Sequence, residues 1–197
     1  MTNPDQRIVL GATGASGSIY ASRLLVHLRR AGLETHLVAS GPAEQVFRFE
    51  RQPLPGATAE GTDGLPGSIV RHEDDNFFAP PSSGSFRHRG MVVVPCSAGT
   101  AGRICAGTGE TLLLRAADVC LKEGRPLIIV LRETPLSRIH LRNLLELSDA
   151  GAKIVPASPG FYHRPSTVEE MVDSVLARVL DLLGIDADIS PRWAEND

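Results

Sequence analysis

Short apolar runs alternate along the chain with segments of helical periodicity. The apolar runs predict strands at 7–10, 34–39, 90–94, 126–131 and 153–156. The segments between and after them predict helices at 18–31, 42–50, 111–123, 136–150 and 167–183. Such alternation of strand and helix is typical of a doubly wound α/β fold.

The strands themselves indicate how the sheet is covered. The runs MVVV and LIIVL contain no polar residue, which is typical of strands covered on both faces in a parallel sheet. Residues 51–70 are rich in Pro and Gly and predict a surface excursion. Because no repeat and no second core pattern is evident, residues 1–197 are expected to form a single domain.

The loops that follow the strands carry the candidate chemistry. In doubly wound sheets, ligands bind at the carboxyl ends of the strands. The first three strands are followed by GATGASG, SGP and PCSAGTAGR, and the last of these opens a further helix. Arg132 and Glu133 follow the fourth strand, and PASPGFYHRP follows the fifth. These loops together predict one binding site at this edge of the sheet.

The first loop, GATGASG, has the glycine spacing of a phosphate-binding turn between a strand and a helix. A dinucleotide fold would place Asp or Glu at the end of the second strand, to bind the ribose. Here that strand ends at Ala39 and Ser40, and Glu34 lies at its start. We therefore interpret the turn as a site for a mononucleotide or another phosphate rather than NAD(P). A tight turn that only packs the strand against the helix is the alternative.

Composition limits the expected cellular location and the partners of the protein. The net charge of -3 argues against a nucleic-acid partner, which would require a basic face. Three cysteines without metal-ligand spacing fit a reducing cytoplasm, and Cys96 is interpreted as a small buried residue. No apolar run is long enough to span a membrane, and the start shows no signal peptide. We expect a cytoplasmic protein without a membrane or nucleic-acid partner.

Aromatic residues gather in two loops, NFFAPPSSGSF at 76–86 and GFYHRP at 160–165. One interpretation is core filling, which is the more common role of an aromatic side chain. The other is an apolar pocket for a flat ring or a hydrocarbon tail, next to His163. With an aromatic content of only 5%, the clustering favours the pocket.

Several long segments together resemble the UbiX-type flavin prenyltransferases. They are GATGASG, APPSSGSF, VVVPCSAGTAGRI, the stretch from RAADV to LLGI, and the final PRW. The resemblance covers nearly all of the chain except 51–74. It implies a Rossmann-like subunit and a dodecamer with its sites between subunits. It also implies, without a metal, transfer of a dimethylallyl group from dimethylallyl monophosphate to N5 and C6 of reduced FMN, and a product that serves UbiD-type decarboxylases.

The resemblance also assigns roles to individual residues. The implied FMN contacts are Gly14, Ala15, Ser16, Ser40, Ser97, Ala98, Gly99, Thr100 and Arg132. The implied contacts of the prenyl donor are Phe77, Tyr162, Arg178 and Trp193, with Tyr162 and Arg178 contributed by a neighbouring subunit. The implied catalytic positions are Ser16, Glu50, Arg115, Lys122 and Glu133.

Two positions depart from the pattern of the family. Phe77 stands where many relatives have Trp, which is expected to weaken the contact with the prenyl group. Glu110 and Thr111 replace an Asn-containing pair, which is expected to affect only the local loop.

The residue types are consistent with prenyl transfer even without the family resemblance. A departing allylic phosphate needs fixed cations, and Arg115, Lys122 and Arg178 are candidates, although a solvated helix face is the usual place for such side chains. The acidic stretch HEDDN runs into Phe-Phe-Ala-Pro-Pro and is interpreted as a solvated loop, not as a helical magnesium site. The absence of a magnesium site fits a monophosphate donor. Glu133 could accept a proton or simply pair with Arg138.

Two other functions stay open at this point. The first is an FMN-dependent cysteine decarboxylase, although such enzymes carry a PASANT-like segment where this chain has PCSAGT. The second is a non-enzymatic carrier of prenylated flavin. A carrier would have no need for Arg115, Lys122 and Arg178 at a second phosphate.

Overall fold

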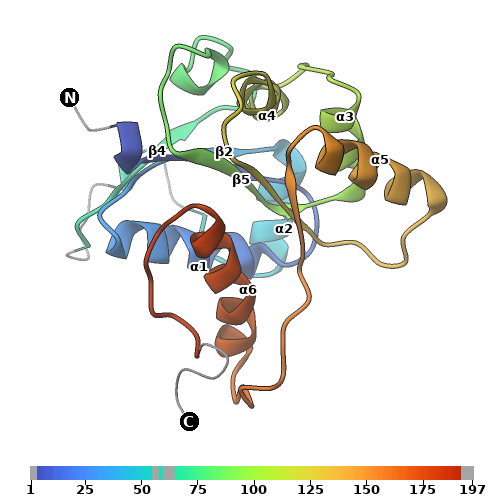
Figure 1. Cartoon of the computed structure of the whole chain (residues 1–197). Helices are drawn as coiled ribbons and strands as arrows, with labels where there is room; N and C mark the ends of the chain where they lie inside the picture. The colour runs from blue at the N-terminus through green and yellow to red at the C-terminus, as the bar shows by residue number, and fades with distance from the viewer. Residues whose placement is uncertain (1–3, 55–57, 60–64, 192–197) are drawn as a thin grey trace.

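A seven-stranded sheet runs through the middle of the molecule (Figure 1). The computed structural model describes residues 4–54, 58–59 and 65–191. The strands are β1 (Arg7–Ala12), β2 (Glu34–Ala39), β3 (Thr58–Ala59), β4 (Ser68–His72), β5 (Gly90–Cys96), β6 (Leu127–Leu131) and β7 (Lys153–Pro156). Their order across the sheet is β3-β4-β2-β1-β5-β6-β7. The short β3 pairs antiparallel with β4, and the other pairings are parallel.

Helices cover both faces of this sheet (Figure 1). On one face lie α1 (Ser18–Arg30), α2 (Gly41–Phe49) and α6 (Val168–Leu182). On the other lie α3 (Ala98–Cys105), α4 (Leu112–Lys122) and α5 (Arg138–Asp149). Short 3-10 turns occur at Pro4–Gln6 and Pro80–Ser82. The doubly wound, Rossmann-like α/β fold is therefore confirmed.

The side chains of the central strands form two cores, one on each face. In β1, Ile8 and Leu10 join the core beneath α1 and α6, whereas Val9 joins the core beneath α4. Every residue of β5 and of β6 is buried. This explains why the apolar runs of these strands are not interrupted by polar residues.

The excursion expected at 51–70 is wrong at its end, because Ser68–His72 forms the strand β4 beside β2. Ile69 is the one fully buried residue of β4, so the strand gives only a weak apolar signal. Its neighbours Arg71 and His72 make polar contacts instead: Arg71 pairs with Glu44, and His72 Nε2 lies 2.8 Å from His36 Nδ1.

A histidine cluster connects β4 to the centre of the molecule. His36 stands between Glu34, 2.8 Å from its Nε2, and His72, and the edge of the Phe86 ring packs against it. Phe86 in turn stacks on His88. Burial lowers the pKa of His72 to about 4, and of His88 to about 4. Both imidazoles are therefore neutral at pH 7.

A buried ionic contact joins the last helix to the first. Asp173 of α6 accepts hydrogen bonds from Arg23 Nε (2.7 Å to Oδ1) and the second guanidinium nitrogen, and its Oδ1 lies 2.9 Å from His27 Nε2. Burial alone would raise the pKa of Asp173, but the hydrogen bonds from Arg23 and His27 outweigh it and lower the pKa. Asp173 is therefore a carboxylate at neutral pH.

Candidate functional site

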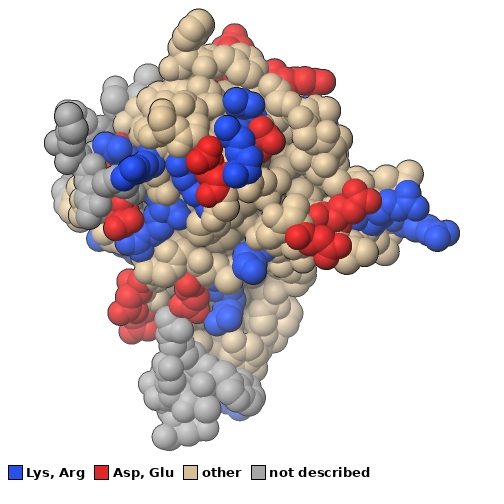
Figure 2. Space-filling view, turned by 45° about the horizontal axis from the view of Figure 1, so that its top comes forward, with Lys and Arg blue, Asp and Glu red and all other residues tan. Residues whose placement is uncertain are grey.

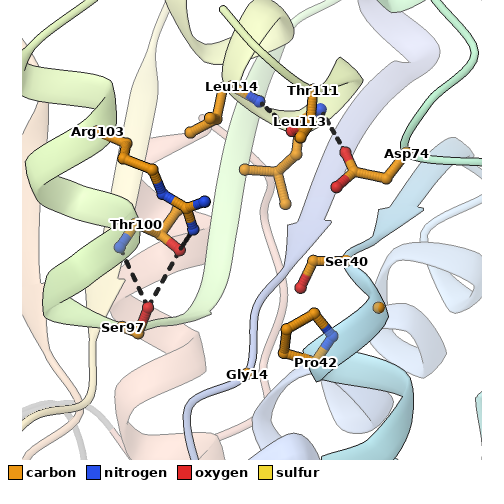
Figure 3. A pocket seen from close by; sticks show the side chains of 11 residues that line it. Gly14, Ser40, Pro42, Asp74, Ser97, Thr100, Arg103, Thr111, Leu113 and Leu114 are labelled. Carbon is orange, nitrogen blue, oxygen red and sulfur yellow. Dashed lines mark hydrogen bonds between the residues drawn. The ribbon is translucent and has the colours of Figure 1, made fainter. Parts of the chain in front are cut away.

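The candidate site lies where the order of the strands reverses. The chain proceeds from β1 to β2 on one side, whereas β5 pairs on the other side of β1. In open α/β sheets, this point leaves a crevice outside the carboxyl ends of the strands. A cavity of about 320 Å³ occupies it, lined by residues that follow β1, β2 and β5 (Figure 3).

Gly14 forms the wall that follows β1. A Cβ atom on Gly14 would lie 2.6 Å from Cβ of Pro42, so the first loop and α2 touch at this point. Three residues later, Gly17 has a φ of 101°, a left-handed conformation that favours glycine. Two of the glycines of GATGASG are therefore explained by packing and backbone conformation.

Two helix N-termini form the polar side of the cavity. The hydroxyl of Ser40 accepts a hydrogen bond from Ala43 N (3.3 Å) at the start of α2, and that of Ser97 accepts one from Thr100 N (3.2 Å) at the start of α3. A Cβ atom on Gly41 or on Gly99 would meet nothing within 4 Å, so both first turns border open space. Helix N-termini with free space before them attract anions.

The start of α4 forms the opposite side. Thr111 caps this helix through Leu114 N (3.4 Å), and Asp74 accepts hydrogen bonds from Leu113 N (2.9 Å, side chain) and Leu112 N (2.7 Å, carbonyl). Figure 3 shows Leu113 and Leu114 on this wall, so it is partly apolar. HEDDN is a loop, as expected, and Glu73, Asp75 and Asn76 are exposed, but Asp74 is half-buried and lines the cavity. Thr111 also lines the cavity, in addition to its local role as a helix cap.

Glu50 follows the last residue of α2, and its side chain reaches the N-terminus of α1. Its carboxylate accepts hydrogen bonds from Gly17 N (3.0 Å), Ser18 N (2.8 Å) and Ser18 Oγ (2.6 Å). Burial alone would raise the pKa of Glu50, but hydrogen bonds from the hydroxyls of Ser16 and Ser18 and from the two backbone N–H groups lower it. The first N–H groups of α1 are thus bound by the carboxylate of Glu50, whereas the first turns of α2 and α3 border the open cavity.

Arg132 and Glu133 lie at the tip of β6. Arg132 N donates to Cys96 O (3.0 Å), and its side chain passes the glycine turn, with Cγ 3.8 Å from where a Cβ on Gly17 would be. Arg132 Nε is buried and has no hydrogen-bond partner in the described part of the chain. Glu133 is half-buried. Within the same residues no ion pair joins it to Arg138, so the simple pairing considered from the sequence is not found.

Arg115 and Phe77 share a second, open hollow of about 420 Å³. Arg115 Nε donates to Ser82 O (3.2 Å), and its Nη1 lies 3.3 Å from Asp118. Phe77 is 43% exposed, so it does not fill the core. Lys122 lies two helical turns further along α4 and pairs with Glu123 at 3.5 Å, so the structure does not place it beside Arg115.

The remaining donor positions lie on the other side of the sheet or outside the described residues. Arg178 is on α6, its side chain is 70% exposed, and it pairs with Asp181 at 3.0 Å. Tyr162 is also exposed, with its ring edge against His163. In Figure 1, α6 and α4 lie on opposite faces of the sheet, so one chain does not bring Arg178 and Arg115 together. Trp193 lies outside the described residues.

Three of the polar or charged residues that line the cavity were not among the predicted site residues: Asp74, Arg103 and Thr111. Thr111 could have been found as a capping residue before an apolar helix. Arg103 follows the cap Ser97 by six positions on a predicted helix, which places it near the same helix end. Asp74 had no signal, because its approach to α4 depends on the path of the loop after β4.

Surface charge and the available metal ligands limit what the protein can bind. On the face shown in Figure 2, acidic and basic side chains are interspersed. In residues 4–54, 58–59 and 65–191, no group of three or more His, Cys, Asp or Glu side chains could hold a metal ion. Among the same described residues, no helix is both long and apolar enough to cross a membrane. Burial raises the pKa of Cys96 to about 12, so it is a packed thiol and not a nucleophile.

Comparison with known proteins shows the family to which the chain belongs. The chain matches the Flavoprotein family over residues 1–181, which defines the class of protein. It is 44% identical to the flavin prenyltransferase UbiX of Pseudomonas aeruginosa, over 99% of this chain and 97% of that protein. The chain belongs to the UbiX family of flavin prenyltransferases.

Two solved structures are similar over almost their whole length. The crystal structure of AnUbiX (PadA1) in complex with FMN and dimethylallyl pyrophosphate has a TM-score of 0.89 and 42% identity, covering 98% of this chain and 100% of that chain. A dodecameric protein of Escherichia coli O157:H7, described as an FMN-dependent UbiX-like decarboxylase, has a TM-score of 0.85 and 43% identity, covering 95% and 98%.

Proposed function

We propose that this chain transfers the dimethylallyl group of dimethylallyl monophosphate to N5 and C6 of reduced FMN. The observation that carries the proposal is the cavity at the strand reversal, which has helix N-termini on one side and leucines on the other. This arrangement suits a molecule with a phosphate at one end and a flat ring system at the other. Membership of the UbiX family identifies that molecule as FMN.

FMN fits the residues that line the cavity. Its phosphate would be held by the N-termini of α2 and α3, with the hydroxyls of Ser40, Ser97 and Thr100. Ala98 and Gly99 belong to the first turn of α3. Toward the glycine turn, Gly14, Ala15 and Ser16 would border the ring, and the unpartnered Nε of Arg132 is a donor available to it.

The prenyl donor would bind where two subunits meet. Arg115 and Phe77 supply one part of that site, and Tyr162, Arg178 and Trp193 of a neighbouring subunit would supply the rest. The position of Arg178 on the opposite face of the sheet supports this division. A dodecamer like that of the E. coli protein would bring such faces together.

The chemistry requires charge stabilisation and three proton transfers: N5 loses a proton when the prenyl group bonds to it, and ring closure adds a proton to the prenyl double bond and removes one from C6. As the allylic phosphate departs, negative charge develops on its oxygen, and Arg115 together with Arg178 of the neighbouring subunit would stabilise it. An aromatic face such as Phe77 or Tyr162 would stabilise positive charge on the allylic carbon. Glu133 would accept the proton lost from C6 of the flavin. Glu50, an ionised carboxylate, would orient the Ser16 hydroxyl.

Three further features complete the proposal. The product would pass to a UbiD-type decarboxylase, which uses the prenylated flavin as its cofactor. Residues 1–197 would act as one domain, since a single sheet extends from Arg7 to Pro156. A cytoplasmic location would keep Cys96, Cys105 and Cys120 as free thiols.

Anaerobic incubation with reduced FMN and dimethylallyl monophosphate tests this function. Mass spectrometry of the flavin should show one added prenyl group. A parallel reaction with dimethylallyl pyrophosphate, the compound bound in the AnUbiX complex, identifies which donor is used. Controls lack the donor or the protein. An unchanged flavin with both donors would contradict the proposal.

Decarboxylation is the second candidate, because the similar E. coli protein is described as a decarboxylase. The two functions are distinguished by adding an aromatic or cysteine-derived carboxylic acid with FMN and no prenyl donor. Release of carbon dioxide by this chain alone would favour decarboxylation. The buried Cys96, with its raised pKa, offers no nucleophile for it.

A further inference from the structure

Arg103 lines the cavity but has no part in the function proposed above. It lies on α3, five residues after the first helical residue, Ala98. Side chains on a helix lean toward its N-terminus, so a long side chain at this position reaches back over the first turn. The structure shows this directly: Arg103 Nη2 donates to Thr100 Oγ1 at 3.3 Å.

No carboxylate in the described part of the chain neutralises the charge of Arg103. Arg115 and Arg178 each pair with an aspartate three residues later, at 3.3 Å and 3.0 Å. For Arg103, no carboxylate of the described residues lies within ion-pair distance, and the side chain is exposed to the cavity. Asp74, on the opposite wall, is already an acceptor for Leu113 N. A guanidinium without a counter-ion, beside a cavity, is available to an anionic ligand.

The groups around Arg103 all favour the same kind of ligand. Thr100 Oγ1 accepts from Arg103 and from Ser97 Oγ (3.1 Å), so the guanidinium and two hydroxyls form one chain at the start of α3. Ser40, at the start of α2, faces them across the cavity (Figure 3). Two helix N-termini supply partial positive charge, and the guanidinium supplies a full charge with a planar fork that matches phosphate oxygens.

We propose that Arg103 binds the phosphate of FMN and makes this site selective for the phosphorylated flavin over riboflavin. The inference rests on the proposed function, since it assumes that FMN occupies this cavity. Helix N-termini alone hold a phosphate through N–H dipoles, whereas Arg103 adds a charge-assisted hydrogen bond to it. The contribution of Arg103 therefore depends on the ligand's phosphate and not on its ring.

The test compares FMN with riboflavin in four proteins: wild type, Arg103→Ala, Arg103→Lys and Arg30→Ala. Arg30 is an exposed arginine at the end of α1 away from the cavity, so Arg30→Ala is a matched loss of charge. Dissociation constants are measured by flavin fluorescence at two salt concentrations. Arg103→Ala should weaken FMN binding roughly tenfold and change riboflavin binding less than twofold. Arg103→Lys should lie between, and Arg30→Ala should match the wild type.

Salt gives a second readout, because loss of a cation from the site should reduce the salt dependence of FMN binding in Arg103→Ala. Equal weakening of FMN and riboflavin, or unchanged FMN binding, would overturn the role of Arg103. The ratio of the two dissociation constants keeps the test valid even if a variant is less stable. If the wild type itself bound no FMN, the proposed function would be wrong, which is a different result.

Discussion

Gly14 lies where the first loop touches α2, and its lack of a side chain is a steric requirement. A Cβ at this position would approach Cβ of Pro42 to 2.6 Å, which real atoms avoid. Gly14→Ala should therefore move α2 away from the cavity, lowering stability by about 1–3 kcal/mol and weakening FMN binding. Chemical denaturation and flavin titration measure the two effects. Gly41→Ala is the control for stability, because a Cβ on Gly41 meets nothing within 4 Å; equal destabilisation by both would contradict the steric argument.

Glu133 is the residue proposed to accept the flavin proton, and Glu133→Gln removes that ability with little change in shape. We expect FMN affinity to stay within twofold of the wild type, since the residue does not line the phosphate side of the cavity. Formation of the prenylated flavin should fall about a hundredfold, which is within the range for loss of a general base. Timed mass spectrometry measures it, with Glu169→Gln, an exposed change on α6, as the control. A normal rate would leave Glu133 a structural residue.

At the scale of elements, β4 is held to β2 partly by the contact between His72 and His36. Burial lowers the pKa of His72 to about 4 from an ordinary 6.5, so the unfolded chain binds a proton more readily than the folded chain. The resulting loss of stability begins as the pH falls below 6.5 and is complete near pH 4. Glu34 and Arg7 beside His36, and His88 beyond Phe86, belong to the same cluster.

His72→Gln keeps a polar partner for His36 but does not titrate. We expect its free energy of unfolding to fall less than that of the wild type between pH 6.5 and pH 4, by about 1 kcal/mol after allowing for partial exposure. Urea denaturation at several pH values measures the difference. Identical pH profiles for the two proteins would show that His72 does not contribute to acid sensitivity.

Asp173 should control the attachment of α6 to α1. Asp173→Ala leaves Arg23 and the buried His27 without their carboxylate, and we expect a loss of about 2–4 kcal/mol of unfolding free energy. Asp181→Ala, which removes the exposed pair with Arg178, should cost less than about 1 kcal/mol. Comparable losses from both variants in thermal or urea denaturation would contradict the difference in burial.

The elements that the sequence predicted were those with strong periodicity. The five predicted strands and the principal helices appear because their apolar residues enter one of two cores, as Ile8 and Val9 do. The strand β4 was missed because it lies near the sheet edge and buries only Ile69 completely.

At the site, Ser40, Ser97 and Thr100 were found through their loops, whereas Asp74 and Arg103 were missed. Their positions depend on packing between elements distant in sequence, which a local pattern does not contain.

At the scale of the whole molecule, the proposed donor site needs more than one chain. Arg178→Ala should therefore raise the concentration of dimethylallyl monophosphate needed for half-maximal rate roughly tenfold, while leaving FMN affinity nearly intact. Steady-state kinetics and flavin titration separate the two ligands, and size-exclusion chromatography checks that the assembly persists. An equal loss of FMN binding would contradict the assignment of Arg178 to the donor.

The carboxylate of Glu50 bears on which cofactors the whole fold can accept. In dinucleotide-binding relatives of this architecture, the first helix N-terminus receives the pyrophosphate. Here the protein supplies a surrogate anion of its own, fixed by Gly17 N and Ser18 N. A pyrophosphate entering that position would have to displace this group and would meet its negative charge. The N-terminus of α1 is therefore already occupied by an anion of the chain itself, which disfavours any cofactor that would place a pyrophosphate there.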